Sequence, residues 1–304
     1  MTKGKTLLIA ADVDATLRER AARDGRFVII DHPVRTEEEL AAIVGDCEIL
    51  VTRSYNRVTR AVMERAPRLE LIAQGTSGTD NIDSDTARKR GIAIVSLPGE
   101  NANAVAELVI GFMIALTRTV PASTEELKAG VWNRYDCSSR HELRHFTLGI
   151  VGLGQVGSRV ARLANAFGMR VQAYDPYIDD DRFVNATRVR SLEELLRTSD
   201  IVTLHVPLTP ETRRMIDVVT MRRGSYLINA ARGEVLDQQK ALAALQSNHI
   251  AGLALDVFDP EPPRDGFAKD PRLILTPQIG GCTDEAKAAI GAKLYEKICA
   301  FYER

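Results

Sequence analysis

The sequence predicts an α/β protein with two doubly wound domains, each built on a parallel sheet. Short apolar runs rich in valine, isoleucine and leucine alternate with segments of helical periodicity along the chain. This alternation is typical of parallel sheets with helices on both faces. The 304 residues are too many for a typical single hydrophobic core, so the length indicates about two domains.

The first hundred residues contain five predicted strands connected by helical segments. The strands are expected at residues 6–10, 27–30, 49–52, 69–73 and 92–95, and the helices between them include residues 36–44 and 59–65. The sequence Ser-Leu-Pro-Gly at 96–99 ends this series, because proline and glycine interrupt regular structure.

The remainder is expected to begin with a long helix over residues 103–129 and a loop over residues 133–145. A second series of strands is then expected at 148–151, 170–174, 201–205, 226–229, 250–255 and 273–275. The last predicted helix, residues 284–302, carries one apolar stripe, formed by Ala286, Ile290, Leu294, Ile298 and Phe301. Since we expect this helix to pack back on the first series, the predicted domains are 1–99 with 283–304, and 100–282.

The composition excludes several classes of partner. Apolar residues make up 45% and charged residues 27% of the chain, as in ordinary globular proteins. Lysine and arginine number 40 against 41 acidic residues, so we expect no bulk attraction for nucleic acid or anionic lipid. The longest apolar stretch, residues 105–120, is interrupted by Glu107 and Arg118 and is too short for a bilayer span. We expect a cytoplasmic protein without membrane segments or a secretory signal.

The four cysteines are spaced too widely for a metal or redox motif. Cys47, Cys137, Cys282 and Cys299 form no C-x-x-C pair. In an intracellular chain of this size we expect buried thiols and no metal site.

Residues 149–157, Gly-Ile-Val-Gly-Leu-Gly-Gln-Val-Gly, carry the most specific local signal. Gly152, Gly154 and Gly157 fit G-x-G-x-x-G, which is weak alone but here follows an apolar strand and opens a helix. The first glycine permits a tight turn, the second lets backbone approach a pyrophosphate, and the third lets helix and strand pack closely. The helix N-terminus adds unpaired N–H groups. These features predict a dinucleotide site.

Asp175 stands at the end of the next predicted strand. A carboxylate there accepts the ribose hydroxyls and repels a 2′-phosphate, so NAD is favoured over NADP. The alternative interpretation is a turn residue before Pro176.

Further motifs follow in a fixed order along the chain. They are Gly-Thr-Ser-Gly-Thr-Asp-Asn-Ile-Asp at 75–83, Ala-Val-Ala-Glu-Leu at 104–108, His-Val-Pro-Leu-Thr-Pro-Glu-Thr at 205–212, Asn-Ala-Ala-Arg-Gly at 229–233, Asp-Val-Phe-Asp-Pro-Glu-Pro at 256–262 and Thr-Pro-Gln-Ile-Gly-Gly at 276–281. With them the chain resembles the D-isomer-specific 2-hydroxyacid dehydrogenases, most nearly the phosphoglycerate dehydrogenase branch without its regulatory domain. The resemblance implies a Rossmann NAD-binding domain inserted in a flavodoxin-like substrate-binding domain. It also implies a homodimer formed through the cofactor domain, including the helix around Val105.

The resemblance assigns roles residue by residue. Arg232 matches the arginine that grips the carboxylate and carbonyl of the substrate, and Glu261 matches the acid that hydrogen-bonds the catalytic imidazole. Ser77 and Gly78 lie in the loop whose N–H groups hold the substrate carboxylate. Asp256 matches the carboxylate beside the nicotinamide ring. The implied cofactor-binding set is Gly152, Gly154, Gln155, Val156, Gly157, Asp175, His205, Pro207, Thr212, Ala230 and Asp256.

Gln278 departs from the family pattern at the chemically decisive position. The family has a histidine here, which donates the proton when a keto acid is reduced, whereas this chain has Thr-Pro-Gln at 276–278. An amide does not titrate near neutrality, so Gln278 can hydrogen-bond a substrate but cannot act as a general acid. None of the five histidines stands at an obvious replacement position.

Four interpretations of Gln278 stay open at this point. The enzyme can use another proton source, such as water or a protonated Glu261. It can be slow and specialised, or it can act on a substrate whose oxidation needs no general base there. In the fourth interpretation catalysis is lost, and the chain is an NAD(H)-binding regulator or scaffold like the C-terminal-binding-protein corepressors of this fold.

Arg53, Arg57 and Arg60 follow a predicted strand of the first domain, at the end where α/β proteins bind ligands. Arg53 and Ser54 also resemble the Arg-Ser turn of the phosphoglycerate branch, whose arginine helps to hold the substrate phosphate. A planar guanidinium suits a second anionic group. The sequence therefore predicts a small, dianionic 2-hydroxy or 2-keto acid as substrate. The alternative is that Arg57 or Arg60 lies on an exposed helix start.

Overall fold

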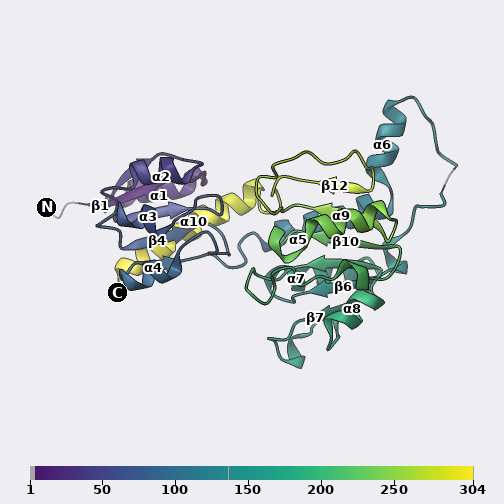
Figure 1. The fold of residues 1–304 in the computed structure, drawn as a ribbon. Helices are drawn as coiled ribbons and strands as arrows, with labels where there is room; N and C mark the ends of the chain where they lie inside the picture. The colour runs from purple at the N-terminus through teal and green to yellow at the C-terminus, as the bar shows by residue number, and fades with distance from the viewer. Residues whose placement is uncertain (1–3, 136, 304) are drawn as a thin grey trace. The chain divides into compact units, whose positions relative to one another are not determined.

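A computed structural model describes residues 4–135 and 137–303 of the chain (Figure 1). The chain divides into two compact units, one of residues 1–101 with 282–304 and the other of residues 102–281. Each unit is built on a parallel sheet, of five and of seven strands. The predicted α/β class with two doubly wound sheets is therefore confirmed.

The first unit has a five-stranded sheet in the order β2-β1-β3-β4-β5, and every neighbouring pair is parallel. This order is that of flavodoxin-like folds, in which ligands bind at the carboxyl ends of the strands. The strands are β1 (Lys5–Ile9), β2 (Phe27–Asp31), β3 (Ile49–Thr52), β4 (Leu71–Gln74) and β5 (Ala93–Val95). The helices are α1 (Ala15–Asp24), α2 (Glu37–Ile43), α3 (Arg60–Glu64), α4 (Ser84–Lys89) and α10 (Asp284–Tyr302).

The C-terminal helix α10 belongs to the core of this first unit. Thr283 caps it, since its hydroxyl accepts from the N–H of Ala286. Ile290, Leu294 and Ile298 lie one helical turn apart and are almost completely buried. They pack in one cluster with side chains of β1, α1, β3 and β4. The apolar stripe therefore covers a face of the five-stranded sheet, although the two segments are nearly two hundred residues apart in the chain.

The second unit has a seven-stranded parallel sheet in the order β12-β11-β10-β9-β6-β7-β8. Strand β6 lies between β9 and β7, so the chain reverses direction across the sheet at β6 and β9, as in the Rossmann fold. The strands are β6 (Thr147–Val151), β7 (Arg170–Tyr174), β8 (Thr187–Arg188), β9 (Ile201–Leu204), β10 (Ser225–Asn229), β11 (Ile250–Leu255) and β12 (Leu273–Leu275). The two-residue strand β8 was not predicted, because it has no apolar run.

The helices of the second unit are α5 (Ala102–Thr117), α6 (Val120–Lys128), α7 (Gln155–Ala166), α8 (Leu192–Thr198) and α9 (Gln238–Gln246). Short 3-10 turns lie at Leu143–His145, Asp180–Arg182, Val218–Thr220 and Gly233–Val235. The prediction of one continuous helix over 103–129 is wrong. The helix breaks between α5 and α6 with a bend of 60°, because Thr119 adopts a left-handed backbone with φ of 51° and Pro121 cannot donate the N–H that a continuous helix needs.

The described residues contain no single helix with the length and apolar composition of a bilayer span. Among the described residues, only the bent pair α5 and α6, taken together, has a sufficient length and apolar composition, and these two properties are the whole of the evidence.

The expectation of four buried thiols is confirmed for Cys47 and Cys299 and is wrong for Cys137 and Cys282, which are exposed. Cys137 lies in the loop after α6, and Cys282 precedes α10, so neither is covered by a sheet or a helix. Burial raises the pKa of the Cys47 thiol to about 12, which keeps it protonated and inert near neutral pH.

Candidate functional site

Most predicted site residues of the second unit lie at the carboxyl edge of its sheet. The glycine motif follows β6, Asp175 follows β7, and His205 follows β9. Ala230 and Arg232 follow β10, Asp256 follows β11, and residues 276–278 follow β12. Because all seven strands are parallel, their carboxyl ends meet at one edge, which is where ligands bind in open α/β sheets. The sheet therefore gathers residues that are more than a hundred positions apart.

Two glycines of the motif are required by close backbone approach. Gly152 has a φ of 91°, and a Cβ there would lie 2.7 Å from the carbonyl oxygen of His205. A Cβ on Gly157 would lie only 2.1 Å from the carbonyl oxygen of Gly152. Any side chain at either position would force the turn after β6 away from α7 or from β9.

Gly154 has the opposite surroundings, since a Cβ there would meet no heavy atom within 4 Å. It is exposed, and it precedes the first residue of α7, Gln155. Val156, the next residue, packs on the hydrophobic core of the unit. An open glycine at a helix N-terminus is what a pyrophosphate needs for close approach to backbone N–H groups. The cradle therefore fits a dinucleotide.

Asp175 is held in a fixed orientation by two backbone N–H groups. Its Oδ2 accepts from the N–H of Leu153 at 2.9 Å, and its Oδ1 accepts from the N–H of Tyr177 at 3.0 Å. The first of these bonds ties Asp175 to the glycine turn. A carboxylate beside the dinucleotide cradle is arranged to accept ribose hydroxyls and to repel a 2′-phosphate.

Tyr177 and Glu211 are site neighbours that sequence analysis missed. The phenol of Tyr177, on the loop after β7, donates to Oε2 of Glu211, on the loop after β9, at 2.5 Å. These two loops flank the glycine turn, because β6 lies between β7 and β9. The two residues are far apart in sequence and exposed, so no local pattern indicates their contact.

Thr212 and Pro207 organise the loop after β9. Thr212 is buried, and its hydroxyl donates to the carbonyl of Pro207 at 2.6 Å and accepts from the N–H of Thr209 at 2.8 Å. Pro207 itself is exposed. Thr212 therefore fixes the loop from inside, and Pro207 presents its ring on the outside.

His205 is bonded locally and is neutral. Its Nε2 lies 3.0 Å from the hydroxyl of Thr203, which is two residues earlier, on β9. Burial lowers the pKa of His205 to about 3. An imidazole of such low pKa carries no proton to donate near neutral pH, so His205 does not replace the missing catalytic histidine.

The loop that carries Arg232 is fixed by Asn229, the last residue of β10. The Asn229 amide donates to the carbonyl of Arg232 at 2.9 Å and accepts from the N–H of Ala231 at 3.1 Å. Gly233 packs against the next loop so closely that a Cβ would lie 1.8 Å from the carbonyl oxygen of Phe258. This contact explains the glycine after Arg232 and joins the loops that carry Arg232 and Glu261.

Glu261 bonds to its own loop, since its Oε1 accepts from the N–H of Phe258 at 3.0 Å. Desolvation by the surrounding protein raises the pKa of Glu261, although part of the side chain is exposed. The Phe258 hydrogen bond and the charge of Arg232 oppose this rise without cancelling it. Arg232 therefore acts electrostatically on Glu261.

Asp256 is the most completely satisfied acidic side chain of the site. It is 2% exposed. Its Oδ1 accepts from the Thr276 hydroxyl at 2.5 Å and from the Ile279 N–H at 2.8 Å, and its Oδ2 accepts from the Gly280 N–H at 2.9 Å. Burial raises the pKa of Asp256, and these three hydrogen bonds oppose the rise. The carboxylate thus folds the loop after β12 around itself.

Gln278 lies within that loop and has a left-handed backbone with φ of 53°. Its N–H lies 2.9 Å from the carbonyl oxygen of Asp256 and 3.0 Å from that of Thr276. A residue with a side chain rarely adopts this conformation. The Asp256 contacts therefore hold Gln278 in a defined and strained position.

In the first unit, Arg53 and Ser54 begin the turn after β3. The N–H of Arg53 donates to the amide oxygen of Asn56 at 3.0 Å, and Asn81 donates to the carbonyl of Arg53 at 3.1 Å. The Arg53 guanidinium lies 3.4 Å from the carbonyl oxygen of Asp12, which follows β1. Two amide side chains thus fix the backbone that presents Arg53 at the carboxyl edge of this sheet.

Ser77 and Gly78 lie in the loop after β4 of the same unit. The buried side chain of Gln74 donates to the carbonyl of Gly78 at 3.1 Å and to the amide oxygen of Asn81 at 2.8 Å. The hydroxyl of Ser77 donates to the carbonyl of Leu97 at 3.2 Å. The loop is therefore fixed from below, and both predicted residues stand on it.

Arg57 and Arg60 are both exposed. Arg60 is the first residue of α3 and pairs with Glu64 one turn later at 2.6 Å, as the alternative interpretation expected. Sequence analysis missed Arg35, which forms an ion pair with Asp12 and lies 4.6 Å from the centre of the Tyr55 ring. This second guanidinium stands near the turn of Arg53, because Asp12 contacts both.

Comparison with known proteins supports the interpretation of both units. Residues 110–280 match the sequence model of the family described as D-isomer specific 2-hydroxyacid dehydrogenase, NAD binding domain. A D-3-phosphoglycerate dehydrogenase from Methanocaldococcus jannaschii is 40% identical over 269 residues, which are 86% of this chain and 51% of that protein. The expectation of NAD as cofactor is therefore confirmed.

Solved structures share the whole fold. A D-lactate dehydrogenase from Aquifex aeolicus complexed with NAD and lactic acid superposes with a TM-score of 0.85 at 29% identity, over 98% of this chain and 96% of that chain. An acyclic imino acid reductase in complex with NADPH and D-Arg gives a TM-score of 0.86 at 25% identity, over 99% and 97%. The chain spans about half the length of the curated relatives it matches first.

Proposed function

We propose that this chain, which belongs to the D-isomer specific 2-hydroxyacid dehydrogenase family, interconverts a small 2-hydroxy acid and its 2-keto acid. One observation carries the proposal. The glycine cradle, Asp175, Arg232, Asp256 and Gln278 all follow strands of one parallel sheet, at its carboxyl edge. When bound, NAD supplies or accepts the hydride, and the residues of this chain bind and orient the acid.

Each side chain has a proposed part in this reaction. Arg232 binds the carboxylate and polarises the C2 oxygen, because a guanidinium donates two parallel hydrogen bonds. Glu261 is an electrostatic neighbour of Arg232, whose charge lowers the pKa of this carboxyl group. Asp256 holds the loop on which Gln278 donates a hydrogen bond to the same C2 oxygen. Electrostatic stabilisation of this kind is often the largest contribution to catalysis, so activity does not require an imidazole.

The test is the loss of NADH absorbance with a panel of 2-keto acids, plain and phosphorylated. Turnover on at least one acid supports the proposal. In the alternative function, an NAD(H)-binding regulator or scaffold, NADH alone raises the melting temperature and no acid raises it further, since only a ligand of the folded state stabilises it. Tight NADH binding without response to any acid would favour that alternative.

The position of Arg53 supports the proposal that the substrate carries a second anionic group. Its backbone is fixed by Asn56 and Asn81, and its guanidinium lies at the carboxyl edge of the first sheet. We expect Arg53→Ala to raise KM for a phosphorylated acid at least tenfold, or about 1.4 kcal/mol, with little change for a plain acid. Arg60→Ala is the matched control, because Arg60 is exposed and paired with Glu64. An unchanged KM for every phosphorylated acid would refute this role.

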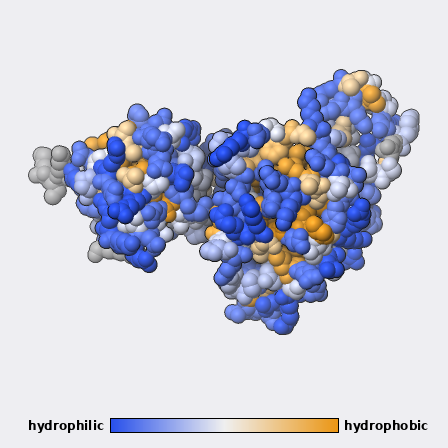
Figure 2. Space-filling model, viewed as in Figure 1, coloured by the Kyte–Doolittle hydropathy of each residue, from blue (hydrophilic) through white to orange (hydrophobic). Residues whose placement is uncertain are grey.

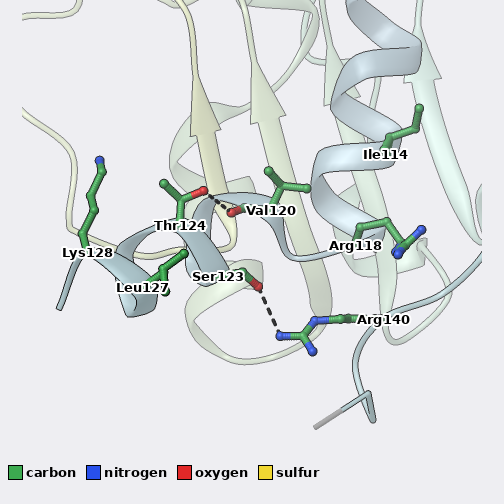
Figure 3. Close-up of a pocket in the computed structure, with 8 residues that line it drawn as sticks. All are labelled: Ile114, Arg118, Val120, Ser123, Thr124, Leu127, Lys128 and Arg140. Carbon is green, nitrogen blue, oxygen red and sulfur yellow. Dashed lines mark hydrogen bonds between the residues drawn. The ribbon is translucent and has the colours of Figure 1, made fainter. Parts of the chain in front are cut away.

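The arm formed by α6 and residues 129–135 supports a homodimer. It projects away from the rest of its unit (Figure 1), and apolar side chains lie on it among hydrophilic ones (Figure 2). Ile114, Val120, Leu127 and Trp132 are exposed, and the first three line one pocket between α5 and α6 (Figure 3). Val105, in contrast, is buried within its own unit. We therefore propose that the dimer contact is formed by the arm and by the exposed side of α5 that carries Ile114, rather than by Val105 itself.

Light scattering of the purified chain tests the dimer. We expect a mass of two chains, and a single-chain mass for Leu127→Asp. Val219→Asp is the control, because Val219 is 72% exposed against 57% for Leu127 and lies far from the arm in sequence. A monomeric wild type, or a dimer that Leu127→Asp leaves intact, would refute this assignment.

A further inference from the structure

The loop after β12 presents an amide where proton transfer to the substrate is expected. The backbone of Gln278 is left-handed, and its N–H points at the carbonyl oxygens of Asp256 and Thr276. Thr276, two residues before Gln278, and Ile279, the residue after it, both donate to the Asp256 carboxylate. The backbone of Gln278 is therefore fixed by hydrogen bonds, and its side chain offers hydrogen bonding without proton release.

Three other polar groups at the carboxyl edge of this sheet do not supply a proton readily. His205 is neutral and bonded to Thr203. Asp256 is saturated by three hydrogen-bond donors. The guanidinium of Arg232 does not deprotonate in proteins. Reduction of a carbonyl would then depend on another proton source, such as Glu261 or water, because the carbonyl oxygen must gain a proton when carbon gains the hydride.

The charges of the described side chains also argue against a carbonyl as the preferred reacting group. Glu261 has one basic and two acidic electrostatic neighbours, because the charge of Arg232 lowers its pKa and those of Glu234 and Asp256 raise it. Acidic groups are therefore in excess over basic ones around Glu261. A protonated imidazole at position 278 would offset this excess of acidic groups, whereas a neutral amide does not. A site with excess negative charge and an amide oxygen favours a substrate that is positive, and that donates N–H, at its reacting group.

We propose that this site prefers the imine of a 2-keto acid, formed with ammonium or a primary amine, over the keto acid itself, and that it releases a 2-amino acid. The inference rests on the proposed function, because Arg232 and the dinucleotide cradle keep the same parts. The amide oxygen of Gln278 accepts an N–H of the iminium group, and Arg232 binds the carboxylate.

The chemistry balances without a protein acid. The keto acid and the ammonium form of the amine first condense with loss of one water, which gives the iminium cation. A hydride, supplied by the reduced nicotinamide, then forms a C–H bond at C2 while the C=N double bond becomes a single bond, and the π electron pair moves to nitrogen. The imine is reduced and the nicotinamide is oxidised by two electrons. The resulting amine takes one proton from water outside the hydride step, so Gln278 need not titrate.

The test measures NADH oxidation by the keto acid panel with ammonium chloride or methylamine, against sodium chloride of equal ionic strength. We expect the amines to raise the rate at least tenfold, and mass spectrometry to identify a 2-amino or N-methyl 2-amino acid. Gln278→His should reverse this preference by raising the rate on the keto acid alone. A gain of activity cannot be caused by misfolding, so this variant keeps the test decisive.

A binding measurement separates the two proposals. With saturating NADH, we expect a 2-amino acid to raise the melting temperature more than the 2-hydroxy acid of the same side chain. Turnover that is insensitive to amines and gives only the hydroxy acid would overturn the imine inference and leave the proposed function standing. No turnover and no stabilisation by any acid, despite NADH binding, would overturn both.

Discussion

The glycine cradle allows a prediction that separates folding from cofactor binding. Gly157→Ala and Gly154→Ala each add one methyl group to the same turn. At Gly157 the new Cβ would lie 2.1 Å from the carbonyl oxygen of Gly152, well inside van der Waals contact. At Gly154 it would meet no heavy atom within 4 Å, and the φ of −75° is one that alanine adopts without strain.

The expected magnitudes follow from these surroundings. Overpacking a core position costs about 1–3 kcal/mol, and the clash at Gly157 is with backbone, so the free energy of unfolding should fall by at least the upper part of that range. Gly154→Ala should change the free energy of unfolding by less than about 1 kcal/mol, since only a weaker N-cap is left. It should nevertheless weaken NADH binding at least tenfold, because the methyl group fills the space for the pyrophosphate.

Two assays check this pair of variants. Denaturant titration gives the free energy of unfolding, and the fluorescence of bound NADH gives its dissociation constant. If Gly154→Ala binds NADH as wild type does, the open space at Gly154 is not the pyrophosphate position. If the two variants lose equal stability, the contacts around Gly157 do not decide the packing of the turn.

Three further predictions concern other parts of the chain. Asp175→Asn keeps an acceptor and removes the charge, so we expect the preference for NADH over NADPH to narrow by about tenfold, near 1.4 kcal/mol, in a comparison of dissociation constants. Leu294→Ala should lower the free energy of unfolding by about 2–5 kcal/mol, measured by denaturant titration, because Leu294 is 0% exposed in the core of the first unit. Hydrogen bonds from Arg26 and Tyr295 lower the pKa of Asp24 to about 2, so the stability that Asp24 contributes is present above the unfolded pKa and is lost as pH falls from about 4 to about 2. Since Arg26 is half exposed, Asp24→Asn should cost only about 1 kcal/mol at neutral pH and less at pH near 2, as denaturation at the two pH values would show.

The strands of both sheets could be predicted because each is an apolar run between punctuating residues. Strand β3, for example, is fully buried from Ile49 to Thr52, and its sequence predicts the same bounds. The break between α5 and α6 was missed because apolar periodicity continues through it. Pro121 was the available signal, but the left-handed Thr119 that completes the break depends on local backbone energetics that periodicity does not show.

The candidate site likewise has parts that the sequence predicts and parts that it does not. The glycine motif is local, so its spacing between an apolar strand and a helix predicts the cradle. The bonding of Asp256 to three groups of the loop after β12 joins positions twenty or more residues apart, and the contact of Tyr177 with Glu211 joins loops of two strands. Such contacts depend on which strands are neighbours in the sheet, and no pattern within one segment records that order.

The backbone of Gln278 bears on whether its side chain is used. A left-handed conformation costs a residue with a side chain about 1 kcal/mol relative to glycine, and the hydrogen bonds around Asp256 maintain it. Glycine would satisfy this loop with less strain. A chain that only binds the dinucleotide has no need for an amide at this strained position, so the geometry favours a working side chain over a vestigial one.

The Gln278→Gly variant tests whether the side chain at this position is needed for turnover. We expect the free energy of unfolding to stay constant or to rise by up to about 1 kcal/mol, while turnover of the accepted substrate is lost. Asn248→Gly is the control, because Asn248 has a φ of 57° on an exposed turn outside the site, so the same backbone relief there should leave turnover unchanged. Full turnover in Gln278→Gly would show that strain at this position is an incidental product of the loop, and the proposals that depend on the amide would fall with it.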